Sequence, residues 1–572
     1  MKKKLLEINH LSIRFPGPEV PLEAVKNNSF VLYKGEILGI VGESGSGKSI
    51  TALSIIQLLP KVAHIHQGSI SLLLNDAGTD SPNSDSYTDL PLLTKDEISD
   101  IRGRRIAMIF QEPMTALNPV LNCGEQVQEA VVRHQKLSSE KAKQKTLDLF
   151  AQVKLPDPER IYRSFPHQLS GGQKQRVMIA MALSCQPDLL IADEPTTALD
   201  ATVQKSILQL LLELKETYHL SMIFISHDLG VIQSIADRVL VMQEGKIVER
   251  GNVKTLFGSP QHPYTKGLLA CRPSLTKDLK RLPTIADFIE KQTEPTKPPK
   301  LIIPDEVSAL SDSPVLLSVK NLATWYPVKK NFMGKPLEYL KAVDNVSFEL
   351  RKGETLGLVG ESGCGKSTLA KTLIGLERPQ FGNIWYEEKD LANISFEDWK
   401  QMRKKIQIIF QDPYSSLNPA QPIGLSIIEP MKVHRLWKNE KQYKEKAIGL
   451  LELVGLNETH FFRLPHEFSG GQRQRICIAR ALSLQPEFII CDECVSALDV
   501  SVQAQILNLL TDLKEQFKLT YIFISHDLSV VRFISDRVMV MKEGKIVESG
   551  TVDAIYSNPQ SPHTRELISA VL

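Results

Sequence analysis

The sequence has no long apolar run and little imbalance of charge, and each absence excludes a class of protein. No stretch of about 18 uninterrupted apolar residues occurs, so we expect no membrane-spanning helix. The formal net charge of +2 argues neither for nor against a polyanionic partner. The first residues carry positive charge without the apolar core of a signal peptide, and we therefore expect a cytoplasmic protein.

Cysteine is sparse, with seven residues scattered along the chain. Only Cys491 and Cys494 have the C-x-x-C spacing, and they flank an acidic pair at the end of a predicted strand. A redox or metal role for this single pair is the alternative reading. We interpret the cysteines as small apolar side chains in a reducing compartment.

One glycine-rich stretch carries the clearest chemical signal. It consists of Gly42, Glu43, Ser44, Gly45, Ser46, Gly47, Lys48 and Ser49, which fit the phosphate-binding P-loop pattern G-x-x-x-x-G-K-[ST]. The apolar residues before it predict a buried strand over 37–41, and a helix is predicted over 50–59. We expect the loop N–H groups to bind phosphate, Lys48 to reach the β- and γ-phosphates of ATP, and Ser49 to ligate Mg²⁺.

The same organisation occurs twice in the chain. The second P-loop consists of Gly360, Glu361, Ser362, Gly363, Cys364, Gly365, Lys366 and Ser367, followed by Thr368. Three more motifs recur at one constant separation: Leu169-Ser170-Gly171-Gly172-Gln173 as Phe468-Ser469-Gly470-Gly471-Gln472, Asp193-Glu194 as Asp492-Glu493, and Ser226-His227-Asp228 as Ser525-His526-Asp527. We therefore predict two nucleotide sites. The first copy has an insertion, mostly within 75–94, with the composition of a surface loop.

The repeat predicts two α/β domains of one type, each with a mainly parallel core sheet, an antiparallel β subdomain and a helical subdomain. In the first copy, helices over 171–183 and 203–218 alternate with apolar strands over 189–192 and 222–225. The helical subdomains are expected over 116–163 and 416–463. We place the domains at 1–271 and 315–572, joined by a proline-rich linker over 272–314.

An acidic pair ends one predicted strand in each copy. Each pair follows four apolar residues, so it should lie at the carboxyl edge of the sheet, beside its P-loop. We predict that Asp193 and Asp492 hold Mg²⁺ through water. Glu194 and Glu493 are predicted to orient or deprotonate the attacking water.

Two histidines and two glutamines are predicted at the same edge. His227 and His526 follow apolar strands and are placed to touch the γ-phosphate and report its loss. No nucleophile elbow G-x-S-x-G accompanies them, which argues against a hydrolase triad. Gln111 and Gln411 end strands and are predicted to approach the metal or the attacking water, with a capping role as the alternative.

A second phosphate-binding end is predicted at Ser170, Gly171, Gly172 and Gln173, and again at Ser469, Gly470, Gly471 and Gln472. In both copies the serine is a good N-cap for the helix that follows. A whole helical segment separates each of these ends from its own P-loop. We therefore predict head-to-tail pairing of the units within one chain, with Lys48 opposite Ser469 and Lys366 opposite Ser170.

Together, these motifs in this order resemble the ABC-type ATPase family, over residues 5–270 and 315–572. The resemblance implies binding and hydrolysis of ATP. It also implies that Phe15 and Tyr326 stack on adenine, that Ser170 and Ser469 contact the γ-phosphate across the pair, and that residues 198–200 and 497–499 link the two sites.

A finer resemblance is to the ATP subunits of bacterial peptide and nickel importers. It rests on Gln111-Glu112-Pro113, Leu117-Asn118-Pro119 and the tail 260–265, each with a counterpart in the second copy. It implies two membrane permease subunits, an extracytoplasmic substrate-binding protein, no nucleic acid, and a peripheral position at the cytoplasmic face of the inner membrane. Some relatives carry an iron–sulfur cysteine cluster after the first tail; only Cys271 occurs here, so we predict no cluster. The predicted cargo is a peptide, with nickel, glutathione or a related molecule as the alternative.

Two other classes of protein also contain ATPase units of this kind. A ribosome-bound translation factor should have a long, charged helical arm between its units, whereas residues 272–314 are short and broken by proline. A DNA-repair or chromosome ATPase should have zinc-type cysteine groups or a long coiled coil, and the sequence has neither. Both classes are therefore less well supported than a transport ATPase.

Overall fold

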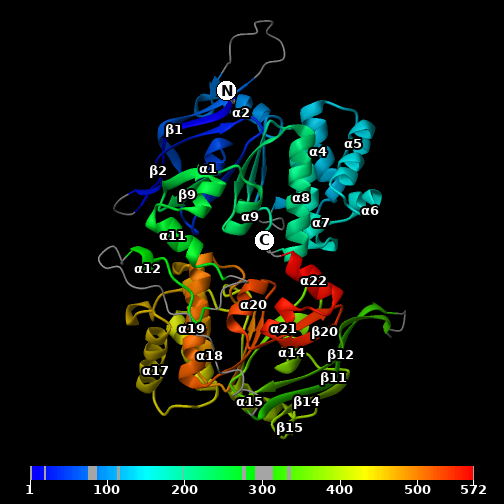
Figure 1. Ribbon diagram of the computed structural model, residues 1–572, viewed down its shortest axis with the longest axis vertical. Helices are drawn as coiled ribbons and strands as arrows, with labels where there is room; N and C mark the ends of the chain where they lie inside the picture. Colours follow the sequence, from blue (N-terminus) through cyan, green and yellow to red (C-terminus); the bar gives the residue numbers. More distant parts are fainter. Residues whose placement is uncertain are drawn as a thin grey trace.

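The computed structural model describes residues 3–17, 21–74, 87–111, 116–197, 199–273, 279–289, 313–330 and 336–570. The two halves of the chain lie one above the other along the long axis (Figure 1). Each half contains a six-stranded sheet and a separate four-stranded sheet, with helices packed around them. The predicted fold class, two tandem α/β units, is confirmed. The domain boundaries at 271 and 315 remain our proposal.

The core sheet of the first half places the P-loop at its centre. Its strand order is β10 (Lys246–Asn252), β9 (Arg238–Gln243), β3 (Ile37–Val41), β8 (Ser221–Ile225), β7 (Leu189–Asp193) and β6 (Ile106–Ile109). All neighbours are parallel except β9 and β10. Every residue of β3, β7 and β8 is buried, which is why these strands read as continuous apolar runs.

The other elements of the first half surround this sheet. The antiparallel sheet contains β2 (Leu22–Tyr33), β1 (Lys4–Phe15), β4 (His64–Leu73) and β5 (Tyr87–Asp89). The helices are α1 (Lys48–Ile55), α2 (Lys95–Ile101), α4 (Cys123–Gln135), α5 (Ser139–Gln152), α6 (Pro158–Arg163), α7 (Gly171–Leu183), α8 (Ala201–Tyr218), α9 (Leu229–Ile235), α10 (Val253–Gly258), α11 (Pro263–Ala270) and α12 (Ala286–Ile289).

The second half repeats this plan. Its core sheet has the order β16 (Ile406–Ile409), β17 (Phe488–Asp492), β18 (Thr520–Ile524), β13 (Thr355–Val359), β19 (Arg537–Lys542) and β20 (Lys545–Thr551). Its antiparallel sheet contains β12 (Pro336–Arg351), β11 (Val315–Lys330), β14 (Phe381–Tyr386) and β15 (Lys389–Asp390). Its helices are α14 (Lys366–Leu373), α15 (Phe396–Lys405), α16 (Ile423–Val433), α17 (Glu440–Leu453), α18 (Gly470–Leu482), α19 (Val500–Phe517), α20 (Leu528–Ile534), α21 (Val552–Ser557) and α22 (Pro562–Ser569).

The helix after the first P-loop differs from its prediction. It was predicted over 50–59, whereas α1 spans Lys48–Ile55. It begins earlier because the left-handed Gly47, with φ of 97°, caps it directly at the end of the loop. It ends earlier because Gln57 adopts a left-handed conformation with φ of 52°, which no continuing helix tolerates.

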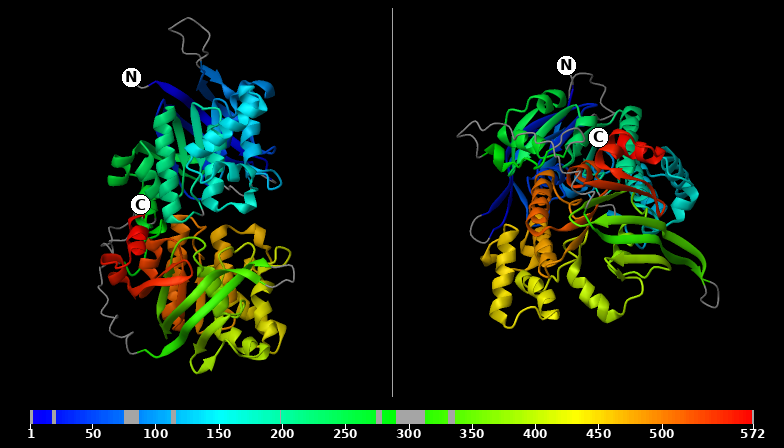
Figure 2. Two further views of the ribbon diagram at one scale, coloured as in Figure 1. Left: turned by 90° about the vertical axis from the view of Figure 1, so that its right-hand side faces the viewer. Right: turned by 60° about the horizontal axis from the view of Figure 1, so that its bottom comes forward.

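The seam between the halves contains the C-terminal helices of both. Figures 1 and 2 show α22 beneath the first half, and Figure 1 shows α11 above α12 and α19. One cluster of buried hydrophobic side chains contains members from both halves, among them Leu268 of α11 and Leu510 of α19. Among the described helices, none is long and apolar enough to span a membrane. The predicted insertion falls partly on 75–86, outside the described residues.

Candidate functional site

The first P-loop folds as a tight cradle in which only glycine fits at the last turn. A Cβ on Gly47 would lie 2.5 Å from the backbone oxygen of Ala24, so the loop is closed against β2. Lys48 is 5% exposed, and its ammonium group donates to the backbone oxygens of Gly42 and Glu43 at 2.8 Å each. Burial lowers the pKa of Lys48, and nearby carboxylates oppose that shift.

The second P-loop has the same geometry. Gly365 has φ of 109°, and a Cβ there would lie only 1.9 Å from the backbone oxygen of Ala342. Lys366 donates to the backbone oxygens of Gly360 and Glu361 at 2.8 Å and 2.9 Å. Both loops therefore present a buried cation and an N-terminal helix end to the same point, which is an arrangement that binds phosphate.

A pair of oxygen donors suited to a hard divalent cation lies at the start of each P-loop helix. The Ser49 hydroxyl donates to Asp193 at 3.2 Å, and the Ser367 hydroxyl donates to Asp492 at 3.1 Å. Burial raises the pKa of Asp193 to about 6, and burial also raises that of Asp492. These paired oxygens fit Mg²⁺, whose charge would hold the aspartates ionised.

Glu194 is held by three side chains that converge on one of its carboxylate oxygens. His227 Nδ1 lies 3.0 Å away, Gln111 donates at 3.1 Å, and Thr197 donates at 2.9 Å. Burial alone would raise the pKa of Glu194, but the hydrogen bonds outweigh it and lower this pKa to about 2. Glu194 also raises the pKa of His227 against the opposing effect of burial. Glu194 is therefore held in a fixed position and is ionised at neutral pH.

Glu493 forms the corresponding unit in the second half, with one partner fewer. His526 Nδ1 lies 3.3 Å from its carboxylate, and Gln411 donates at 2.8 Å. Ser496 donates to the backbone oxygen of Glu493, not to its carboxylate. Gln111 and Gln411, which we predicted to approach the metal or the attacking water, each contact the glutamate of the acidic pair in their own half.

Both glutamates have a backbone conformation that L-residues rarely adopt. The φ angle is 49° at Glu194 and 47° at Glu493. This left-handed turn directly after the strand carries the glutamate away from the preceding aspartate, so that the two carboxylates have different partners. Such local strain is common at functional sites, where the surrounding contacts enforce it.

A cavity of about 500 Å³ at the second P-loop receives residues from both halves. The second half contributes Lys366, Glu493 and Tyr326, and the first half contributes Thr197 and Asp200. Tyr326 lines this cavity together with Thr368, the residue that follows the P-loop motif. In the first half, Phe15 ends β1 and is half-buried.

The two halves contact each other reciprocally at the P-loops. The Ser44 N–H donates to Asp499 at 2.8 Å, and the Ser362 N–H donates to Asp200 at 3.3 Å. A second contact accompanies each of these bonds, from Ser501 to Glu43 and from Thr202 to Glu361 at 3.2 Å. The halves are thus arranged head to tail. The P-loop of the first half contacts the start of α19, and the P-loop of the second half contacts the start of α8.

The serines of the second predicted phosphate-binding end are exposed. Ser170 and Ser469 each accept a hydrogen bond from the N–H of the glutamine three residues on, which caps α7 and α18. In the described parts of the chain, neither serine hydrogen-bonds a P-loop residue. Ala198, Glu112 and Pro113 of the predicted motifs lie outside the described residues.

Sequence reasoning missed a contact between the first P-loop and α11. The hydroxyl of Tyr264, a fully buried residue, accepts a hydrogen bond from the Glu43 N–H at 3.1 Å. The repeat places His563 at the same position of α22, where its Nε2 has no hydrogen-bond partner among the described residues. The one sequence signal for this contact was that Tyr264 and His563 differ in tails that are otherwise similar.

Replacing Tyr264 by phenylalanine is expected to lower the thermal unfolding midpoint by a few degrees. The change leaves the partly buried Glu43 N–H without this partner, which costs about 1–3 kcal/mol, and each kcal/mol shifts the midpoint by roughly 2–4 °C in a unit of this size. Scanning calorimetry of the parent and variant measures the shift. Tyr87→Phe, which removes a more exposed hydroxyl bond of 3.2 Å, is the matched control. Equal midpoints in all three proteins would contradict the expected contribution.

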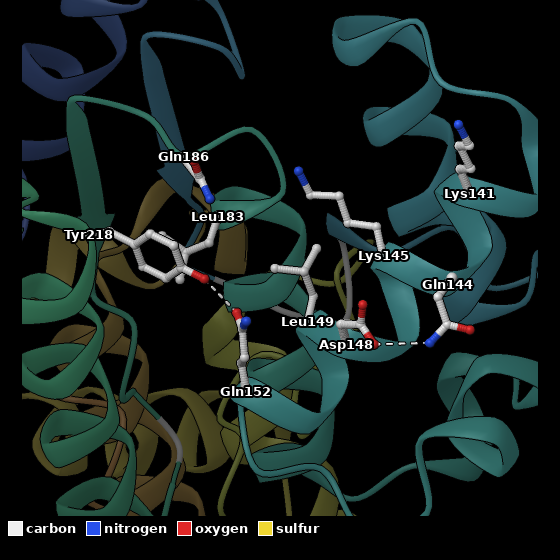
Figure 3. A pocket seen from close by; sticks show the side chains of 9 residues that line it. All are labelled: Lys141, Gln144, Lys145, Asp148, Leu149, Gln152, Leu183, Gln186 and Tyr218. Atoms are coloured by element: carbon white, nitrogen blue, oxygen red, sulfur yellow. Dashed lines mark hydrogen bonds between the residues drawn. The ribbon is translucent and has the colours of Figure 1, made fainter.

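Another cavity, of about 380 Å³, lies between α5, α7 and α8, away from both P-loops (Figure 3). Its polar side chains hydrogen-bond one another, as Tyr218 does with Gln152 and Gln144 with Asp148. No sequence motif falls on it. We assign it no part in the chemistry.

Comparison with protein families identifies both halves. A family model described as ABC transporter matches residues 25–197 and 343–496. A second model, described as the C-terminal region of oligopeptide/dipeptide transporters, matches residues 248–299. That segment includes α11 and α12.

Curated proteins similar to this chain match it along its whole length. The glutathione import ATP-binding protein GsiA of Escherichia coli K12 is 48% identical over 99% of this chain and 89% of its own. GsiA of Shigella flexneri is 47% identical over the same shares of the two chains.

Two solved structures are similar to a single half of the chain. The ATP-binding cassette MJ0796 bound to ADP and Pi is 27% identical, with a TM-score of 0.38, over 41% of this chain and 98% of its own. CbiO1 of Clostridium perfringens is 26% identical, with a TM-score of 0.37, over 43% of this chain and 91% of its own.

The family match covers both P-loops, both acidic pairs and the helices between them, and the whole-length relatives have the same two-unit organisation. ATP binding and hydrolysis are the common chemistry of these cassettes. The chain therefore belongs to the ABC transporter family, as an ATPase that carries the family's ATP-binding cassette twice.

Proposed function

We propose that this protein is the ATP-hydrolysing subunit of an importer for small peptides, glutathione included. The observation that carries the proposal is the full-length similarity to GsiA, together with the segment typical of oligopeptide/dipeptide transporters. Glutathione is itself a tripeptide, so the two resemblances indicate related cargo. Nickel remains the alternative cargo.

The partners follow from the same proposal. Two membrane permease subunits would bind the paired cassettes at the cytoplasmic face of the inner membrane, and an extracytoplasmic protein would deliver the cargo to them. The two cassettes pair within one chain, and the reciprocal contacts of Asp499 and Asp200 with the opposite P-loops support this arrangement.

We further propose a role for each group at the ATP sites. Lys48 and Lys366 bind the β- and γ-phosphates, while Phe15 and Tyr326 stack on adenine. Mg²⁺, held near Ser49 and Asp193 and near Ser367 and Asp492, supplies charge neutralisation at the phosphates. Ser170 and Ser469, exposed here, reach the γ-phosphate when the halves close further on ATP.

Glu194 and Glu493 act on the attacking water in this proposal. A carboxylate whose pKa is about 2 is ionised at neutral pH and accepts a hydrogen bond from water, which orients the water towards the γ-phosphate. His227 and Gln111 hold the Glu194 carboxylate in position through their bonds of 3.0 Å and 3.1 Å. In this proposal, His227 and its counterpart His526 contact the γ-phosphate and lose that contact when the phosphate leaves.

Uptake by intact cells tests the cargo. Cells lacking this gene are expected to take up little labelled glutathione or tripeptide, and the parent gene should restore uptake. The Glu194→Gln, Glu493→Gln double variant is the matched control and should restore none. Uptake of labelled Ni²⁺ that depends on the gene, without any effect on peptides, would replace the peptide proposal by the nickel alternative. Unchanged uptake of all three, with slowed protein synthesis, would indicate a translation factor.

A further inference from the structure

Helix α19 of the second half is buried more extensively than its counterpart α8 in the first half. Ser501, Ala504 and Asn508 of α19 are 1%, 0% and 3% exposed. The repeat aligns them with Thr202, Lys205 and Gln209 of α8, of which the first is half-buried and the other two are exposed. The two equivalent helices therefore pack against different surroundings.

Part of the surroundings of α19 is a segment within the predicted linker, residues 279–289, which we call the strap. The Leu282 N–H donates to the Asn508 side chain at 2.9 Å, and the Asn508 amide donates back to the Leu282 oxygen at 2.8 Å. Arg281 pairs with Asp512 at 2.8 Å. Leu282 and Ile285 are 2% and 8% exposed, so the strap is packed into the core that the halves share.

The strap is also fixed to the first half through α11. A Cβ on Gly267 of α11 would lie 3.0 Å from the Ile285 Cα, so glycine is what permits this close approach. Helix α11 carries Tyr264 to Glu43 of the first P-loop, and Glu43 is the residue that Ser501 of α19 contacts. The first half therefore holds α19 at two places, at its start and at its middle.

At the opposite seam, Thr202 contacts Glu361 as Ser501 contacts Glu43, but the positions that correspond to Gly267 and Asp512 differ. Glu566 of α22 takes the place of Gly267, and Glu213 of α8, at the position of Asp512, pairs with Lys154 of its own half. At that seam, Lys205 also donates to the backbone oxygen of Ser569 at 2.8 Å. The hydrogen bond from the Ser362 N–H to Asp200 is also longer, at 3.3 Å, than the equivalent bond from the Ser44 N–H to Asp499, at 2.8 Å.

We propose that the strap keeps the α19 seam closed throughout the ATPase cycle, so that the chain opens at the second P-loop while the first P-loop keeps its partner. Asn508, Leu282 and Arg281 are then positioning residues for Asp499 and Ser501. This inference rests on the proposed opening and closing with ATP. It deepens that mechanism by making the two ATP sites inequivalent.

Crosslinking each seam tests the proposal. One variant carries Arg281→Cys and Asp512→Cys across the strap seam, and the other carries Lys205→Cys and Ser569→Cys across the opposite seam. A short bismaleimide crosslinks the two cysteines of each pair. The chain is then cut at a protease site inserted within 290–312. A denaturing gel shows whether the two halves stay joined after the cut. The parent chain, treated in the same way, reports any reaction of the native cysteines.

The strap crosslink should form equally with and without ATP and leave at least half of the parent rate of ATP hydrolysis. The opposite crosslink should slow hydrolysis at least about fivefold, because reopening must break that contact. If the strap crosslink needs one nucleotide state, or slows hydrolysis as much as the opposite one does, the proposal is overturned. A parent chain that hydrolyses no ATP would instead overturn the proposed function, while the crosslinking pattern would still report on the strap.

A second measurement uses the single variants Asn508→Ala and Gln209→Ala, which are matched by the repeat. Release of a fluorescent ADP analogue from the parent should be biphasic, with a slow phase that the Lys48→Ala variant lacks. Asn508→Ala should speed that phase roughly fivefold or more, the factor that about 1 kcal/mol gives, and Gln209→Ala should not. Equal effects of both variants, or no effect of either, would contradict a positioning role for Asn508.

Discussion

ATP hydrolysis is expected to slow by roughly 10²-fold or more when either Glu194 or Glu493 is replaced by glutamine. The amide keeps the shape of the side chain but loses the negative charge that orients the attacking water. ATP binding should persist, because neither glutamate hydrogen-bonds a P-loop residue among the described contacts. Phosphate release measures the rate, and a fluorescent ATP analogue measures the binding.

The control for these variants is Glu216→Gln, since Glu216 is a glutamate of α8 whose side chain is 77% exposed. Its rate should equal that of the parent. If Glu194→Gln and Glu493→Gln also hydrolyse ATP near the parent rate, these glutamates do not act on the water. If only one of them slows hydrolysis, the other site is regulatory.

Replacing Lys48 or Lys366 by alanine is expected to weaken ATP binding about tenfold or more and to cut hydrolysis strongly in each single variant. A hydrogen bond to a charged group contributes about 1.5–3 kcal/mol, and each lysine is the buried cation of its loop. Because the halves share one closure, loss of one site should impair both. Titration with the ATP analogue, together with steady-state hydrolysis, measures the two effects.

Lys141→Ala, which changes an exposed lysine of α5, is the control for these variants. Scanning calorimetry separates loss of binding from loss of folding, because each P-loop lysine also bonds two backbone oxygens of its own loop. A variant that folds, binds ATP weakly at one site and still hydrolyses at the parent rate would show that the altered site is idle.

The elements predicted best are those whose determinants lie within a few residues. The helix predicted over 171–183 is α7 with the same bounds, because Ser170 and Gln173 form a capping box that fixes its start. The strands predicted over 189–192 and 222–225 match β7 and β8 to within a residue, since fully buried parallel strands consist of apolar runs. The P-loops, the acidic pairs and the histidines were likewise readable from local pattern and order.

The partners of these local elements were harder to predict. The glutamines after β6 and β16 contact glutamates, because left-handed turns at Glu194 and Glu493 rotate those carboxylates towards them. No sequence pattern specifies a left-handed glutamate. The strap was read as part of a proline-rich linker, although Leu282 and Ile285 have the spacing of one helical face and Gly267 marks a close approach.

The sequence by itself determined that this protein has two phosphate-binding cassettes of one family, since glycines, caps and apolar runs act over a few neighbouring residues. Only the tertiary structure decided how the cassettes meet. Asp499 reaches Ser44 across 455 residues of chain, and Asn508 reaches Leu282 across 226. Contacts at such separations depend on the packing of whole helices, so two helices at equivalent positions of the repeat, α8 and α19, acquire different surroundings.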